Sequence, residues 1–289
     1  MVRARAAFEA LRRRLEAAGV EDAAFDAALL VETQAGENWR WQDPALDAAA
    51  LVRLEALTAR RAAREPLQYI LGRWPFLDFE LAVGPGVLCP RADTELLVEQ
   101  GAKLLAGKSS PAVLDLCAGS GCVGLGVKRL YPGARVTCLE KSPEAFAWLA
   151  KNAASALPGF DGARPAVACV AGDVFGYQRQ LAAGSLDLIL SNPPYVTDGE
   201  MERLAPEVRR EPALALRAGQ QGLAFYEHIA PAYRPALRPG GWLAVEIGWR
   251  QGAAVEEIFR TAGYRNVARR QDLEGRDRVV LGQASEKER

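Results

Sequence analysis

Histidine is almost absent from this chain of 289 residues, because only His228 occurs. The five cysteines include no Cys-x-x-Cys pair. Zinc sites need cysteine and histidine ligands clustered at close spacing, so the sequence predicts no metal site. A single histidine outside every motif is typical of a helix surface, and we expect that position for His228 rather than a catalytic role.

Long apolar runs are also absent, since none approaches the length that a membrane-spanning helix needs. The odd number of cysteines and the lack of a signal-peptide pattern favour reduced thiols and a cytoplasmic protein. We therefore expect no membrane partner.

Neither sign of charge is in excess, because 36 basic residues balance 36 acidic ones. Proteins that bind nucleic acid through its phosphates usually carry a basic excess, so the balance disfavours such a partner without excluding a local basic patch. With 49% hydrophobic and 25% charged residues, the chain resembles an ordinary globular enzyme whose core needs no disulfide or metal. We expect a monomer without direct nucleic-acid contacts.

Helical periodicity dominates the first part of the chain. Alanine, leucine, arginine and glutamate are abundant there, and apolar residues such as Leu11 and Leu15 recur at helical spacing. Segments 22–33 and 44–64 repeat the pattern. The economical interpretation is a small helical bundle over residues 1–73.

The pattern changes between residues 74 and 90. Apolar runs flank Gly84-Pro85-Gly86, which is a strand-turn-strand signal. We expect a connecting β-hairpin over 74–90, with its turn at these three residues.

From about Ala112 onward, strand and helix patterns alternate. Strands separated by helix-length segments predict an α/β domain over 91–283, in which helices cover both faces of a mostly parallel sheet, followed by a polar tail over 284–289. In such a sheet a ligand binds beyond the carboxyl ends of the strands. The expected strands are 112–114, 135–139, 166–170, 186–190, 242–246, 266–268 and 278–281, and the clearest helices are 143–156 and 251–262.

A glycine-rich turn follows the first of these strands. Gly119, Gly121 and Gly124 have the spacing G-x-G-x-x-G, which resembles a dinucleotide-binding turn, although a plain strand-to-helix turn gives the same pattern. Asp115 at the strand end repels phosphates and favours a ligand with a positive ammonium group. The turn is therefore a candidate cofactor site.

Acidic residues follow the next two strands. Glu140 can accept hydrogen bonds from both ribose hydroxyls of a nucleoside, a group that NAD and S-adenosylmethionine share; an exposed surface glutamate is the alternative. Asp173 can meet the amine of an adenine, or it can cap a helix. Neither Glu140 nor Asp173 distinguishes a site for NAD from a site for S-adenosylmethionine.

The sharpest signal is Asn192-Pro193-Pro194-Tyr195, after the fourth strand. Two consecutive prolines remove two N–H donors and fix two φ angles, which stiffens the loop. The Asn192 amide oxygen and a loop carbonyl can then accept both hydrogens of a planar NH₂ group. Tyr195 offers an aromatic face to the same group. These two acceptors and the aromatic face favour an N-methyltransferase site over the alternative, a rigid turn with no catalytic role.

The same four residues resemble the Asn/Asp-Pro-Pro-Tyr/Phe motif of methyltransferases that act on amide or amino nitrogens. Distant segments narrow the match, and together they span almost the whole chain. The combined set resembles the HemK-type peptide chain release factor N5-glutamine methyltransferases. The additional segments are 64–72, 87–95 and 210–216, followed by Gly219 and Gly222.

The resemblance implies a seven-stranded, Rossmann-like class I methyltransferase domain, preceded by a small all-helical domain that docks the substrate protein. It implies S-adenosylmethionine as the methyl donor. It also implies, as acceptor, the glutamine of a Gly-Gly-Gln loop on class I release factors.

The resemblance also implies roles for single residues. Residues 117–121 wrap the methionine portion of the cofactor, Glu140 holds its ribose and Val174 lies beside its adenine. Arg91 and Thr94 lie near the amino-acid end of the cofactor or at the pocket rim. The expected cofactor-binding set is Asp115, Cys117, Ala118, Gly119, Ser120, Gly121, Glu140, Asp173, Val174 and Asn192. The expected catalytic residues are Asn192, Pro193 and Tyr195, and the substrate-binding set adds Pro194, Arg91 and Thr94.

The chain departs from the common family pattern at three places. Cys117 stands where glycine is frequent, Glu140 where aspartate is frequent, and Ala92-Asp93 where Pro-Glu is frequent. The longer Glu140 side chain can still bridge two hydroxyls. None of the changes removes a group that the reaction needs.

Three other functions are open at this point. A methyltransferase for adenine or guanine amino groups in DNA or RNA uses the same loop, although the charge balance and the lack of an evident target-recognition domain count against it. A nicotinamide-dependent dehydrogenase uses the glycine turn, but Asp115 and the proline loop argue otherwise. A non-catalytic module could use the helical domain to dock a partner.

Overall fold

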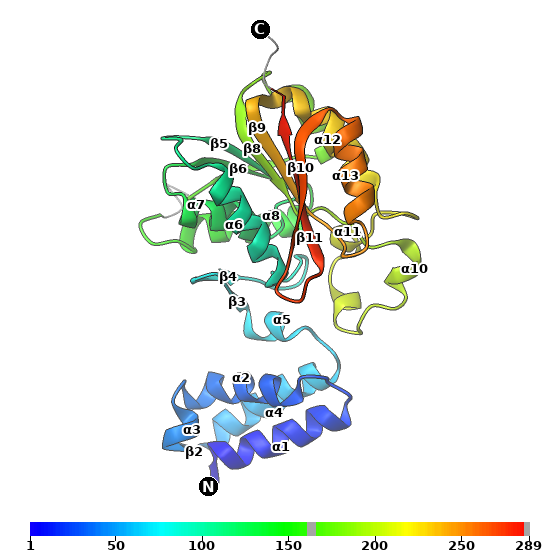
Figure 1. The fold of residues 1–289 in the computed structure, drawn as a ribbon. Helices are drawn as coiled ribbons and strands as arrows, with labels where there is room; N and C mark the ends of the chain where they lie inside the picture. The colour runs from blue at the N-terminus through cyan, green and yellow to red at the C-terminus, as the bar shows by residue number, and fades with distance from the viewer. Residues whose placement is uncertain (161–165, 286–289) are drawn as a thin grey trace. The chain divides into compact units, whose positions relative to one another are not determined.

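The computed structural model describes residues 1–160 and 166–285, and the chain forms two compact units (Figure 1). The first comprises Met1–Gly72 together with Ala205–Arg210, and the second comprises Arg73–Leu204 and Glu211–Arg289. The sequence pattern places the boundary one residue later and assigns all of 91–283 to the second unit. The return of Ala205–Arg210 to the helical unit is therefore a feature that the pattern did not predict.

The first unit is built from helices. The longest of them, α4, begins after Asp47, whose carboxylate accepts a hydrogen bond from the Ala50 N–H at 2.7 Å and so caps the helix. The buried core of this first unit includes Leu15, Leu30 and Leu54. Its elements are α1 (Ala4–Ala17), α2 (Ala23–Ala35), α3 (Trp39–Gln42), α4 (Ala48–Ala62) and α5 (Leu67–Leu71), with the short paired strands β1 (Val2–Arg3) and β2 (Ala45–Leu46).

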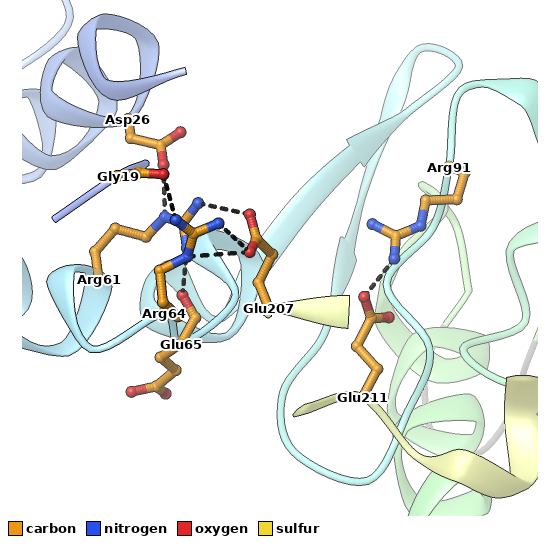
Figure 2. A network of polar contacts seen from close by, with 8 residues as sticks. All are labelled: Gly19, Asp26, Arg61, Arg64, Glu65, Arg91, Glu207 and Glu211. Carbon is orange, nitrogen blue, oxygen red and sulfur yellow. Dashed lines mark hydrogen bonds and ion pairs between the residues drawn. The ribbon is translucent and has the colours of Figure 1, made fainter. Parts of the chain in front are cut away.

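A buried ion-pair network lies within this unit (Figure 2). The Arg61 guanidinium donates to Asp26 at 2.5 Å and to Glu207 at 3.2 Å, and both Arg61 and Asp26 are buried. Arg64 donates to the other oxygen of Glu207 at 2.6 Å. Glu207 belongs to the returning segment, so this network attaches that segment to the helices.

Arg61→Leu is expected to lower the free energy of unfolding by about 3–5 kcal/mol, because it leaves a buried carboxylate without its partner. Burial already raises the pKa of Asp26, against the opposing effect of its hydrogen bond to Arg61. Urea denaturation of the full chain measures the loss. The double variant Asp26→Leu/Arg61→Leu removes both charges and should recover much of it; a double variant no more stable than Arg61→Leu contradicts this account of the pair.

A β-hairpin opens the second unit, and its turn lies at Leu77 and Asp78 rather than at Gly84-Pro85-Gly86. Strands β3 (Arg73–Phe76) and β4 (Phe79–Ala82) pair in antiparallel register. Leu77 takes a left-handed conformation (φ 52°), and its N–H donates to Glu95 at 2.8 Å. Gly84 and Gly86 instead permit close packing, because an added Cβ would lie 2.5 Å from the Trp148 ring and 2.7 Å from Glu144, respectively.

Seven strands form the main sheet, in the order β10-β11-β9-β8-β5-β6-β7. Each strand that the sequence predicts has a counterpart, which confirms the α/β fold class with a largely parallel sheet. The parallel strands are β5 (Ala112–Leu116), β6 (Arg135–Glu140), β7 (Ala168–Ala171), β8 (Leu186–Ser191) and β9 (Leu237–Glu246), and the antiparallel ones are β10 (Tyr264–Gln271) and β11 (Asp277–Ala284).

Side chains alternate across the sheet and divide the core into two clusters. Leu188 and Leu190 of β8 belong to the cluster that α6, α7 and α8 cover, and Ile189 belongs to the cluster under α12 and α13 (Figure 1). The helices are α6 (Asp93–Leu104), α7 (Cys122–Leu130), α8 (Pro143–Ser155), α9 (Val174–Tyr177), α10 (Asp198–Met201), α11 (Ala213–Leu216), α12 (Ala224–Tyr233) and α13 (Gly252–Thr261), with 3-10 turns at Gln178–Gln180, Val208–Arg210 and Arg234–Ala236.

All five cysteines carry free thiols. Within residues 1–160 and 166–285, no helix combines the length and apolar character needed to cross a bilayer. In the same part of the chain, no three His, Cys, Asp or Glu side chains gather as metal ligands. Of the predicted polar tail, residues 286–289 lie outside the described part, and Ala284 ends β11.

Candidate active site

A cleft of about 1000 Å³, open solvent included, lies at the carboxyl ends of the parallel strands. Segments that follow β5, β6, β7 and β8 all contribute to its wall, which is where ligands bind in open α/β sheets. Eleven of the predicted site residues line it: Arg91, Thr94, Cys117, Ala118, Gly119, Ser120, Glu140, Asp173, Val174, Asn192 and Pro194. Asp115, Gly121, Pro193 and Tyr195 are not among its lining residues.

The turn after β5 has an unusual backbone. Cys117, Gly119 and Gly121 all have positive φ, at 58°, 55° and 85°. The Ala118 N–H donates to the Leu139 carbonyl at 3.0 Å, which ties the turn to the neighbouring strand. Left-handed conformations suit glycine, so a glycine at the position of Cys117 would fit this backbone without strain.

We expect Cys117→Gly to leave the free energy of unfolding within about 1 kcal/mol of the parent value, because relief of strain and the added chain entropy oppose each other. Cys117→Val should lower it by about 2 kcal/mol or more, since a β-branched side chain fits the left-handed region poorly. Urea denaturation compares the variants. If the Val variant is as stable as the parent, the left-handed backbone at Cys117 is not strained by a side chain.

Glu140 ends β6 and is 9% exposed as a residue. One oxygen accepts the Gly119 N–H at 2.8 Å, and the other accepts the N–H groups of Lys141 and Ser142 at 2.8 and 2.7 Å. The carboxylate thus joins the glycine turn to the turn that precedes α8. An ionised carboxylate offers about four acceptor positions, so at least one is left for a ligand hydroxyl. Glu140 is not the exposed surface residue that the sequence left open.

Asp115 lies behind the glycine turn instead of facing the cleft. Its Oδ2 accepts the Gly124 N–H at 2.9 Å, while its Oδ1 is buried without a hydrogen-bond partner among the described residues. Burial raises the pKa of Asp115 to about 7. Alternation along β5 places this side chain under the first turn of α7, so its visible role is to hold the turn.

Asp173 caps α9, which confirms the helix-cap interpretation, and it also lines the cleft. One oxygen accepts the Phe175 N–H at 3.0 Å, and the other pairs with the Lys141 ammonium at 2.8 Å. The Lys141 hydrogen bond, followed by that of the Phe175 N–H, lowers the pKa of Asp173. The Asp173 carboxylate at the cleft wall is therefore already bound by the Phe175 N–H and the Lys141 ammonium.

Val174 is buried beside the cleft, and its carbonyl meets His228 of α12, which is less exposed than the expected helix-surface position. The Tyr233 hydroxyl donates to the Val174 carbonyl at 2.8 Å, and His228 Nε2 donates to the same oxygen at 3.2 Å. The His228 ring is half-buried, with its centroid 4.7 Å from that of Phe175. The contact between His228 and the Val174 carbonyl could not be predicted from the sequence, because the two residues lie far apart in the chain.

Asn192 projects from the end of β8 into the cleft wall. Its Nδ2 donates to the Thr94 hydroxyl at 3.1 Å, so the amide oxygen is turned away from Thr94. The Ser191 hydroxyl donates to the Leu116 carbonyl at 2.8 Å and holds β8 against β5 just before the loop. Of the two prolines, Pro194 lines the cleft.

Tyr195 is held through its backbone, because its carbonyl accepts a hydrogen bond from Gln251 Nε2 at 3.2 Å. The residue is half-buried, and burial raises the pKa of its hydroxyl. The sequence did not identify Gln251, since a glutamine before a helix has no distinctive spacing.

Glu211 joins two segments that lie far apart in the sequence. Its buried carboxylate pairs with Arg91, which lines the cleft (Figure 2). It also accepts the Cys89 N–H at 2.8 Å. Both segments figure in the family resemblance, but their contact was not predicted. Apolar wall residues that the sequence also missed include Leu88, Val123, Leu139, Pro212, Leu214 and Phe225.

Comparisons with known proteins agree with this arrangement. Residues 6–72 match the PrmC N-terminal domain family, and residues 85–221 match the methyltransferase small domain family. Similar proteins include the release factor glutamine methyltransferases of Geobacter sulfurreducens (40% identical, 91% of this chain and 90% of that protein) and Caulobacter vibrioides (39%, 96% and 94%). That of Vibrio cholerae is 38% identical over 96% of each chain. The chain belongs to the release factor glutamine methyltransferase family.

Proposed function

We propose that the protein transfers a methyl group from S-adenosylmethionine to the side-chain amide nitrogen, N5, of the glutamine in the Gly-Gly-Gln loop of class I peptide chain release factors. The observation that carries the proposal is the Asn192 amide at the cleft wall, fixed by Thr94 with its oxygen turned away from that contact. Family membership supports the same reaction.

The residues that follow β5 and β6 fit the cofactor. The positive-φ turn at Cys117 and Gly119 brings backbone groups to the cleft wall, where the methionine portion needs polar contacts. Glu140 has acceptor capacity left for ribose hydroxyls, and the buried Val174 offers an apolar surface for adenine. Asp115 contributes indirectly, by holding the turn. When bound, S-adenosylmethionine supplies an electrophilic methyl group.

The Asn-Pro-Pro-Tyr loop then orients the acceptor. The amide nitrogen of glutamine is a poor nucleophile, because its lone pair is delocalised into the carbonyl. Asn192 Oδ1 and a loop carbonyl next to Pro193 accept the two amide hydrogens, which holds the nitrogen in line for attack. A general base before attack is unnecessary, since the N-methylated amide loses its proton readily afterwards. Tyr195 does not line the cleft, and the hydrogen bond from Gln251 to its carbonyl holds this end of the loop.

We also propose that the helical unit docks the body of the release factor. The exposed large apolar side chains of the unit include Phe25, Trp41 and Val52, with Trp41 86% exposed. These side chains offer apolar area that a protein partner can cover. In this proposal the enzyme acts as a monomer on a protein substrate in the cytoplasm, where translation is terminated.

The test is transfer of isotopically labelled methyl from S-adenosylmethionine to purified release factor, to the same factor with its Gly-Gly-Gln glutamine replaced by alanine, and to DNA and RNA. We expect label on the first substrate only. Label on nucleic acid, or equal label on the alanine variant, overturns the proposal.

A further inference from the structure

Glu246 is a buried acid that neither the cleft lining nor the family motifs include. It is the last residue of β9 and is 1% exposed. Its Oε2 has no hydrogen-bond partner among the described residues. Buried carboxyl groups are costly, so a position like this requires a physical explanation.

Sheet register places Glu246 next to the catalytic loop. Strands β8 and β9 are parallel neighbours, with Ser191 opposite Val245, so Asn192 and Glu246 occupy the next positions along the two strands. Leu190 and Ala244, two residues earlier on each strand, both face the cluster under α6. By alternation, Asn192 and Glu246 point to the same side.

Thr94 stands between these two side chains. It is the second residue of α6, which packs against both β8 and β9, and it is 1% exposed. Its hydroxyl accepts a hydrogen bond from Asn192 Nδ2 at 3.1 Å. A hydroxyl carries a single hydrogen, and because Thr94 Oγ1 accepts from Asn192, its own hydrogen is free to point toward the Glu246 carboxylate, whose pKa Thr94 lowers.

We propose that Glu246 is a positioning residue for the transfer, which acts through Thr94 to keep the Asn192 amide with Nδ2 turned away from the acceptor nitrogen and Oδ1 turned toward it. The proposal rests on the function proposed above. An ionised Glu246 accepts the Thr94 hydrogen, so Thr94 can only accept from Asn192. If the amide flips, its NH₂ group meets the NH₂ of the substrate, and two donors oppose each other.

Titration of Glu246 gives a readout that a purely structural role lacks. Burial raises its pKa to about 7, and the hydrogen bond from Thr94 opposes that shift. Of the charged groups around it, Asp93 also raises the pKa, whereas Arg278 and Arg91 lower it. The Tyr195 ring is a further titratable neighbour, and the Tyr226 hydroxyl donates to the backbone carbonyl of Glu246 at 3.0 Å. As the pH falls through the pKa, the protonated acid becomes a donor and no longer fixes the direction of the Thr94 hydrogen.

The test is a double-mutant cycle on the full chain, with single-turnover methylation of release factor as the assay. Glu246→Leu should lower kcat by about tenfold or more, while the affinity for S-adenosylmethionine and the KM for release factor stay near the parent values. In a Thr94→Val background the same change should have little further effect, because the connection is already broken. Thr94→Ser keeps the hydroxyl and should restore most of the rate.

The near-isosteric Glu246→Gln serves as a second probe that is expected to fold. The parent should lose kcat as the pH falls through about 7, and the Gln variant should lack that step. Additive effects of Glu246→Leu and Thr94→Val, or an unchanged pH profile in the Gln variant, overturn the inference. If the parent methylates no release factor at all, the proposed function fails first, and the two failures are thereby distinguished.

Discussion

Asn192→Ala is expected to reduce the rate of methyl transfer by two to three orders of magnitude, roughly what loss of one transition-state hydrogen-bonding group costs in other enzymes. The alanine side chain removes the acceptor that Oδ1 offers to the substrate NH₂. Cofactor affinity should fall only modestly, because the glycine turn and Glu140 are unchanged. Single-turnover kinetics with saturating release factor measures the rate, and calorimetric titration measures the affinity.

Asn192→Asp is the matched control. Aspartate keeps acceptor oxygens at the same distance from the backbone, so this variant should retain more activity than Asn192→Ala. It cannot donate to Thr94 as the amide does at 3.1 Å, so it should still fall short of the parent. Near-normal turnover of the alanine variant would remove Asn192 from the mechanism.

Glu140→Ala should weaken S-adenosylmethionine binding by about a hundredfold, which corresponds to about 2.7 kcal/mol. The change removes the acceptor for the ribose and also releases the N–H groups of Gly119, Lys141 and Ser142. Loss of these charge-assisted hydrogen bonds should lower the free energy of unfolding by about 2–3 kcal/mol. Calorimetric titration and urea denaturation give the two values.

Glu140→Asp controls for the shape of the site, because aspartate is frequent at this position in the family. A shorter carboxylate can still meet ribose hydroxyls, so cofactor affinity should stay closer to the parent than in the alanine variant. If the alanine variant binds S-adenosylmethionine as tightly as the parent, the ribose contact assigned to Glu140 is wrong.

Much of the sheet and the position of the cleft could be predicted from local patterns. Apolar runs such as 186–190 mark strands by themselves, and the rule that ligands bind beyond strand ends selects the residues that follow them. Glu140 and Asn192 were found in this way, since each stands directly at a strand end. Consecutive prolines at 193 and 194 made the loop distinctive.

Contacts between distant segments could not be predicted in the same way. Glu207 joins the helical unit although it lies far along the chain, and its sequence neighbours show only an ordinary charged stretch. Glu211 and Arg91 stand within recognised segments, yet their ion pair follows from the fold alone. Asp115 was placed at the correct strand end, but the direction of its side chain depends on strand alternation under α7. Each case turns on pairing that no single segment encodes.

Tandem mass spectrometry of release factor, after incubation with the enzyme and S-adenosylmethionine, shows which atom receives the methyl group. One CH₂ is expected on the glutamine of the Gly-Gly-Gln loop, on its side-chain amide, and Asn192→Ala should leave this peptide largely unmodified under the same conditions. A methyl group on another residue, or no methyl group on release factor while the enzyme binds the cofactor, would contradict this expectation.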